Sequence, residues 1–133
     1  MPGLVIKFPA GDRIIINGAV VENAGRGARL RLLSPDTQLL RLRDALDPEK
    51  ANTPVGRITH AVQLAVAGEA PVEEVRTKAM PALDALAQAF LDAADRDMIG
   101  EIRALLAKGD AYRALRRLQV LRVREAQLLG IEP

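Results

Sequence analysis

Residue types that perform catalysis are scarce in this chain of 133 residues. It contains no cysteine and one histidine, His60, so a thiol nucleophile and a thiolate or paired-imidazole metal site are both excluded. It also lacks a phosphate-binding loop with a following Lys-Ser/Thr, the G-x-S-x-G pattern and the HExxH pattern. Acidic side chains at Asp44, Asp47 and Glu49 are typical of a helix start. We therefore predict that the protein is not an enzyme, needs no cofactor or metal, and uses His60 structurally.

Arginine is the residue type that points to binding. Of the 19 basic residues, 15 are arginine, whose planar guanidinium binds phosphate through two hydrogen bonds and stacks on bases. Residues 1–46 carry seven basic and four acidic side chains, residues 47–100 five and nine, and residues 101–124 seven and two. Two basic regions thus flank an acidic one. Nucleic acid is one partner class that fits this distribution, and arginine-rich codon usage explains the arginine bias equally well.

The N-terminal third has the pattern of short strands. Asn17-Gly18 lies between two apolar runs, and this dipeptide favours the type I′ turn of a β-hairpin. Residues 28–32 and 38–43 alternate apolar and basic side chains with period two, which places arginines on one face of each strand. We expect about five strands, arranged as a small antiparallel roll or barrel.

From residue 47 onward the apolar spacing is helical. Asn52-Thr53-Pro54 offers a capping side chain followed by proline at the first helical position. Pro81 falls inside a later helical pattern and is expected to kink or break that helix near Met80. Asp110 is expected to cap the last helix, and Gly130 to end it.

Together these patterns predict an α+β fold in two parts. Residues 1–46 are expected to form a β subdomain, and residues 47–133 a helical subdomain with a bundle of three to four helices, ending in a helical hairpin at 97–129. No signal peptide is visible, and no apolar run approaches the ~20 residues of a membrane span. We therefore expect a cytoplasmic protein that does not contact membranes.

Two groups of arginine are candidate binding residues. The first belongs to the strands and their loops and is a candidate RNA-binding set: Arg26, Arg29, Arg31, Arg41 and Arg43. The second covers a sector of about 100° on the last helix and is a candidate partner-binding set: Arg113, Arg116, Arg117 and Arg124. The alternative for both groups is a solvated surface. Arg122 and Glu125 lie three residues apart towards the apolar face, where they are expected to pair.

Three segments together resemble the FlbT family of flagellum biosynthesis repressor proteins. The first is Ile-Asn-Gly-Ala-Val-Val-Glu-Asn at residues 16–23. The second runs from Leu39-Leu40-Arg41-Leu42-Arg43-Asp44 through Ala51-Asn52-Thr53-Pro54 to Arg57-Ile58. The third is Gly109-Asp110-Ala111-Tyr112-Arg113-Ala114-Leu115, continuing to Glu125. The resemblance is collinear and covers nearly the whole chain.

The resemblance implies post-transcriptional control. A member of this family is expected to bind the 5′ untranslated region of flagellin mRNA, to lower the translation and stability of that message, and to work in a system that includes FlaF. The alternative is an adaptor that binds FlaF or flagellin through its helices without touching RNA. Self-association into a homo-oligomer is compatible with either reading.

Overall fold

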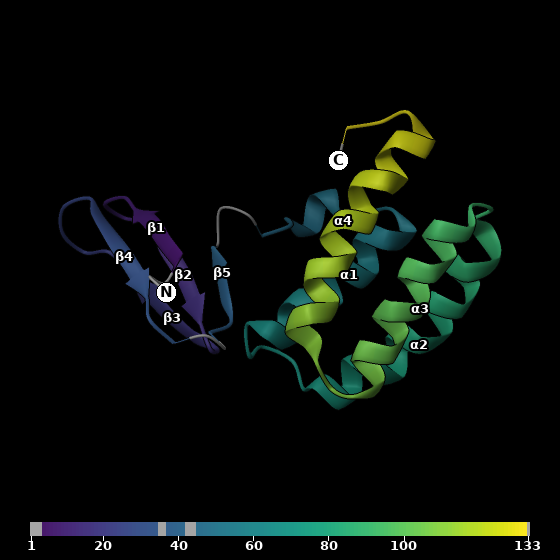
Figure 1. Cartoon of the computed structure of the whole chain (residues 1–133), viewed down its shortest axis with the longest axis horizontal. Coiled ribbons are helices and arrows are strands. Elements are labelled where there is room, and N and C mark those ends of the chain that lie inside the picture. The colour runs from purple at the N-terminus through teal and green to yellow at the C-terminus, as the bar shows by residue number, and fades with distance from the viewer. Residues whose placement is uncertain (1–3, 35–36, 42–44, 133) are drawn as a thin grey trace. The chain divides into compact units, whose positions relative to one another are not determined.

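Strands and helices occupy separate parts of the chain in the computed structural model (Figure 1). The structure describes residues 4–34, 37–41 and 45–132. The chain divides into two compact units, Met1–Ala45 and Leu46–Pro133. The described residues of the first unit form five antiparallel strands, and those of the second form four α-helices. The predicted α+β fold, with strands before helices, is confirmed.

The five strands form two small sheets. In one, β1 (Leu4–Phe8) pairs with β4 (Ala28–Leu32). In the other, β2 (Arg13–Ile16) lies between β3 (Ala19–Glu22) and β5 (Leu39–Arg41). Among the described residues the two sheets do not join into a closed barrel, because no hydrogen-bonded ladder links one sheet to the other.

The hairpin between β2 and β3 turns at Asn17-Gly18, as predicted. Both residues have positive φ, 49° and 85°, which a type I′ turn requires. Asn17 also positions the start of β5, because its backbone N–H donates to the backbone carbonyl of Gln38 (2.8 Å). The Asn17 side-chain oxygen accepts from the amide of Gln38 (2.9 Å). One residue therefore sets the turn and the start of β5.

The core of the strand unit takes side chains from both sheets. Its buried centre is Ile6, Phe8 and Ile14, and partly buried apolar residues pack around it: Ile16, Leu30 and Leu39. In β1 and β4 the core residues occupy alternate positions. The intervening side chains of these two strands must therefore point to the opposite, exposed face.

The helical unit is a four-helix bundle. A short 3-10 helix, η2 (Pro48–Lys50), precedes α1 (Pro54–Val66), α2 (Val72–Ala89), α3 (Ala93–Ala107) and α4 (Ala111–Leu129). In the bundle α1 packs against α2 and α4, and α3 packs against the same two helices. Among the described residues no helix is long and apolar enough to cross a bilayer.

Side-chain caps set the helix boundaries. Thr53 accepts a hydrogen bond from the amide of Gly56 (3.0 Å), and Asp110 accepts one from the amide of Arg113 (3.1 Å), as expected from the sequence. Gly130 ends α4 in the left-handed conformation, with φ of 68°. The predicted hairpin at 97–129 begins earlier, at Ala93, because Asp92 accepts from the amide of Ala94 (2.8 Å) and caps α3.

Of the kink or break predicted near Met80, the break is wrong, because α2 runs without interruption through Pro81. Proline removes one helical hydrogen bond, and Pro81 lies on the exposed side of the helix. Buried side chains before and after it, Val75 and Leu83 among them, hold both halves of α2 in the bundle. Tertiary packing therefore outweighs the local helix-breaking tendency of proline.

Candidate nucleic-acid interface

The exposed face of the β1–β4 sheet carries three cations. In the antiparallel register Lys7 lies opposite Arg29, and Val5 lies opposite Arg31; all four side chains are exposed. Arg29 and Arg31 therefore share a face, as the alternation of β4 predicted. The sequence analysis missed Lys7. The signal was present, because Ile6 and Phe8 on either side of Lys7 are apolar and face the core.

These three cations, which we call the strand cation face (Lys7, Arg29 and Arg31), have no neutralising partner within residues 4–34, 37–41 and 45–132. None of them forms an ion pair with any residue that the structure describes. Like charges directly opposite each other across a strand pair are destabilising. The Lys7–Arg29 pair thus carries an electrostatic cost, and an anionic ligand on this face would remove it.

Arg26 lies in a loop that is tied to one end of the β1–β4 sheet. It lies in the loop between β3 and β4, and Asn23 organises this loop by donating from its side-chain nitrogen to the carbonyl oxygens of Phe8 (2.8 Å) and Arg26 (2.7 Å). The amide of Gly25 donates to the side-chain oxygen of Asn23 (3.0 Å). The loop is therefore tied to the end of β1, next to Lys7, and the Arg26 side chain is exposed there.

Arg41 does not join this face. It lies on β5 in the other sheet, opposite Ile14, which belongs to the buried core, and it is half-buried. Leu39 and Leu40 are both apolar, so the alternation in this strand does not decide which side faces the core. Both sides of β5 are covered: Leu40 is 4% exposed, and Leu39, on the same side of the strand as Arg41, is partly buried against the cluster of Ile6, Phe8 and Ile14. Arg43 lies outside the described residues.

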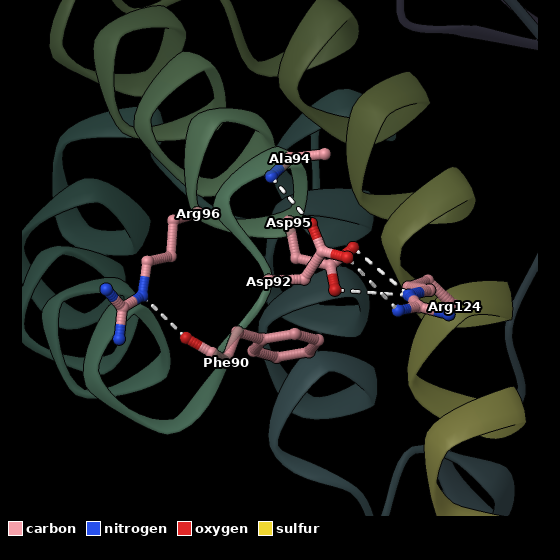
Figure 2. Close-up of polar contacts among 6 residues, drawn as sticks. All are labelled: Phe90, Asp92, Ala94, Asp95, Arg96 and Arg124. Carbon is pink, nitrogen blue, oxygen red and sulfur yellow. Dashed lines mark hydrogen bonds and ion pairs between the residues drawn. The ribbon is translucent and has the colours of Figure 1, made fainter.

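The arginines of the helical unit are bound to carboxylates in several places. In Figure 2, Arg124 reaches from α4 to two aspartates at the start of α3. Its Nε lies 3.2 and 3.1 Å from the two carboxylate oxygens of Asp95, and its Nη2 lies 3.8 Å from Asp92. Asp95 is buried, and its position in the first turn of α3 also favours a negative charge. Arg124 therefore links α3 to α4.

The other candidate arginines of α4 divide into two kinds. Arg117 Nε lies 3.4 Å from Glu101 of α3, and Arg113 Nε lies 3.6 Å from Asp110, which caps its own helix. Arg116 is exposed and makes no ion pair with any described residue. The predicted partner-binding set is therefore split, with Arg117 and Arg124 turned towards α3, and Arg113 and Arg116 on the outer side.

The second and third resemblance segments meet inside the helical unit. The buried carboxylate of Glu125 on α4 accepts a hydrogen bond from the amide of Val55 in the first turn of α1 (3.0 Å). That amide belongs to the helix start, where intrahelical acceptors are absent. The predicted pair between Arg122 and Glu125 is not formed, because the carboxylate serves the end of α1 instead.

The loop before α1 is closely packed on the helix that it caps. A Cβ atom added at Gly56 would lie 2.8 Å from the hydroxyl of Thr53 and 3.3 Å from the Cα of Ala51. Thr59, which is buried one turn later, donates to the carbonyl of Val55 (2.8 Å). The Ala51-Asn52-Thr53-Pro54 segment and Glu125 thus serve one structural junction between α1 and α4.

The described residues contain no group of three or more His, Cys, Asp or Glu side chains arranged to hold a metal ion. His60 is half-buried in the middle of α1. The polar groups that the structure brings together are arginines, lysine and structural carboxylates. Their chemistry is that of anion binding and of helix packing.

Comparison with known proteins identifies the family. The family model for flagellar protein FlbT matches residues 4–129. A probable flagellum biosynthesis repressor protein FlbT from Brucella anthropi is 31% identical over 131 residues, covering 98% of this chain and 85% of the relative. Proteins of the same name from Brucella ovis (32% over 128 residues, 96% and 83%) and Chelativorans sp. (30% over 125 residues, 94% and 85%) are similarly related. No solved structure shows a significant match. The chain belongs to the FlbT family of flagellar proteins.

Proposed function

We propose that this protein represses flagellin synthesis by binding the 5′ untranslated region of flagellin mRNA, which lowers the translation and stability of the message. The names of its relatives support a repressor of flagellum biosynthesis. The observation that carries RNA binding is the strand cation face, in which three adjacent cations lack carboxylate partners among the described residues. RNA supplies phosphates to neutralise them, and arginine also stacks on unpaired bases.

The composition of this face predicts how RNA is bound. Phe8 is buried in the core, so β1 and β4 expose no aromatic side chain for base stacking. Binding then depends mainly on phosphate contacts, with arginine supplying what stacking there is. Three phosphate contacts to single-stranded RNA correspond to a slope of about −2 in log K against log salt concentration.

The experiment combines binding and translation. Fluorescence anisotropy with the purified full chain is expected to show tighter binding to a flagellin 5′ leader than to a scrambled leader of equal length. An in-vitro translation reporter behind the same leader should be repressed by the native chain and not by R29A/R31A. R13A is the matched control, since Arg13 is an exposed strand arginine already paired with Glu22 (2.8 Å). Equal binding to both leaders, with no repression, would overturn the proposal.

A second candidate function is a protein adaptor that acts through FlaF or flagellin. The observation in its favour is that Arg113 and Arg116 stand on the outer side of α4, where Arg116 has no ion pair within the described part of the chain. If the protein is such an adaptor, it should not bind RNA. Pull-down of FlaF or flagellin by the purified protein should then be weakened by R113A/R116A. R117A, at an arginine turned towards Glu101, is the control.

A further inference from the structure

Asn23 anchors the loop between β3 and β4 through every polar group that it has. Its backbone N–H donates to the carbonyl of Asp12 (3.0 Å), and its own carbonyl accepts from the N–H of Gly11 (2.8 Å). Its side-chain amide holds the carbonyl of Arg26 (2.7 Å) and the N–H of Gly25 (3.0 Å). The backbone at Arg26 is therefore positioned in advance, whereas the Arg26 side chain is exposed.

Two glycines flank Arg26, and the fold requires glycine at neither position. Gly25 and Gly27 are both exposed, and neither has a positive φ. A Cβ atom at Gly25 would lie 3.9 Å from the side-chain oxygen of Asn23, which is an ordinary contact, and one at Gly27 would have nothing within 4 Å. Glycine is also the residue that lets a ligand approach the backbone closely. The open backbone on both sides of Arg26 can thus accept a flat ligand.

The side chain of Arg26 supplies hydrogen-bond donors and no acceptor. Its guanidinium forms no ion pair or hydrogen bond with any described residue, and its backbone N–H also has no acceptor among them. A planar fork of N–H groups pairs best with two acceptors that lie side by side.

Among the four bases, guanine presents such a pair of acceptors, O6 and N7, on its Hoogsteen edge. On the corresponding edge adenine has a donor beside N7, cytosine presents a donor, and uracil presents one acceptor. Hoogsteen edges of unpaired bases in RNA are open to protein side chains. The chemistry of Arg26 therefore favours guanine over the other three bases.

We propose that Arg26 recognises one unpaired guanine of the bound RNA, which lies against the backbone of Gly25 and Gly27. The inference rests on the proposed function, because it assigns base recognition to the RNA site of the strand unit. The strand cation face then holds phosphates and sets the salt dependence, while Arg26 discriminates between bases. A phosphate contact by Arg26 is the alternative, and it differs measurably, because contacts to phosphate release counterions.

The first test varies the base. The probes are short oligouridines with one central guanine, inosine, 7-deazaguanine or adenine, and fluorescence anisotropy measures their binding to the full chain. Inosine keeps O6 and N7, 7-deazaguanine lacks N7, and adenine has an amino group in place of O6. Guanine and inosine should bind about tenfold more tightly than the other two. Equal binding of all four probes would overturn the inference and leave the proposed function standing. Absence of binding to these probes and to the leader would overturn both.

The second test separates base contact from phosphate contact. R26A should abolish the preference for guanine and keep the native slope of log K against log salt concentration. K7A is the matched control, because it removes a cation of the strand cation face. It should keep the preference and reduce the slope by about 0.7. An R26A chain that keeps the preference and loses slope as K7A does would assign Arg26 to phosphate and overturn the inference.

The third test uses the glycines. G25A and G27A should keep the native melting temperature, because neither Cβ meets an obstacle, and should weaken the preference for guanine by obstructing the base. G100A is the control, since Gly100 is an exposed glycine of α3 that also has nothing within 4 Å, and its replacement should leave RNA binding unchanged. Native preference in both G25A and G27A would contradict the close approach of the base.

Discussion

The two units of this molecule use the same residue type in opposite ways. In the strand unit Arg29 and Arg31 stand beside Lys7 with no carboxylate partner among the described residues. In the bundle Arg124 and Arg117 reach across to acidic side chains of α3. The difference comes from the neighbours, since α3 presents Asp92, Asp95 and Glu101 to α4 while β1 presents lysine to β4. The number of arginines in a region is therefore a poor guide to binding, and the side chains placed opposite them are a better one.

The largest effect is expected on RNA affinity, from the variant K7A/R29A/R31A. At about 0.1 M salt the loss of three phosphate contacts corresponds to a fall in RNA affinity of about 100-fold. The melting temperature should stay level or rise slightly, because the like-charge pair Lys7–Arg29 is removed. Anisotropy and thermal circular dichroism measure the two quantities on the same sample. A large loss of stability with little change in affinity would reverse the contrast between the two units.

Glu125→Ala tests the structural side of the comparison. It leaves the amide of Val55 without its acceptor in a buried place, and we expect the free energy of unfolding to fall by about 2 kcal/mol. RNA affinity should not change, because Glu125 lies in the helical unit. Chemical denaturation measures the effect, with Glu125→Gln as the control, since its side-chain oxygen still accepts the hydrogen bond and a smaller loss is expected.

Arg124→Ala should lower the free energy of unfolding by less than Glu125→Ala does, by about 1 kcal/mol. The variant leaves Asp95 without its cation in a buried position, but the Arg124 side chain is 39% exposed, so solvent screens part of the interaction. Arg116→Ala, measured by the same denaturation experiment, is the comparison. Arg116 has no ion pair among the described residues, so its replacement should lower the free energy of unfolding by less. Equal losses for both variants would show that Asp95 does not depend on Arg124.

Arg117→Ala is expected to change the free energy of unfolding least of these variants. Both Arg117 and its partner Glu101 are more than half exposed, and such surface pairs contribute from 0 to about 0.5 kcal/mol. Raising the salt concentration should remove even this difference between native and variant chains. A loss above 1 kcal/mol would mean that the surface pairing between α3 and α4 matters more for the bundle than its exposure indicates.

Local signals predicted much of the fold. The turn at Asn17-Gly18 and the caps at Thr53 and Asp110 are determined by a few adjacent residues, and the structure contains all three. The break expected at Pro81 did not occur, because the packing of α2 on both sides of the proline is a tertiary effect. The spacing of apolar residues along the chain does not show how strongly the two halves of a helix are held by the helices packed against it.

The candidate site was predicted in part. Arg29 and Arg31 were placed together correctly, because one strand sets their relation. Lys7 joined them only through the pairing of β1 with β4, which period-two alternation does not reveal. Arg41 was grouped with them because of its alternating pattern, yet its strand lies in the other sheet, and Arg41 shares the side of that strand on which Leu39 packs against the core. Strand pairing, which depends on contacts between distant residues, decides the outcomes for Lys7 and Arg41.

The salt dependence of binding to a flagellin 5′ leader tests the central claim most directly. For the native chain we expect log K to fall with log salt concentration at a slope of about −2, and for K7A/R29A/R31A a slope close to zero. R113A/R116A should keep the native slope, because those arginines belong to the helical unit. A native slope near zero, or one that is lost in R113A/R116A and kept in K7A/R29A/R31A, would contradict the assignment of RNA binding to the strand cation face.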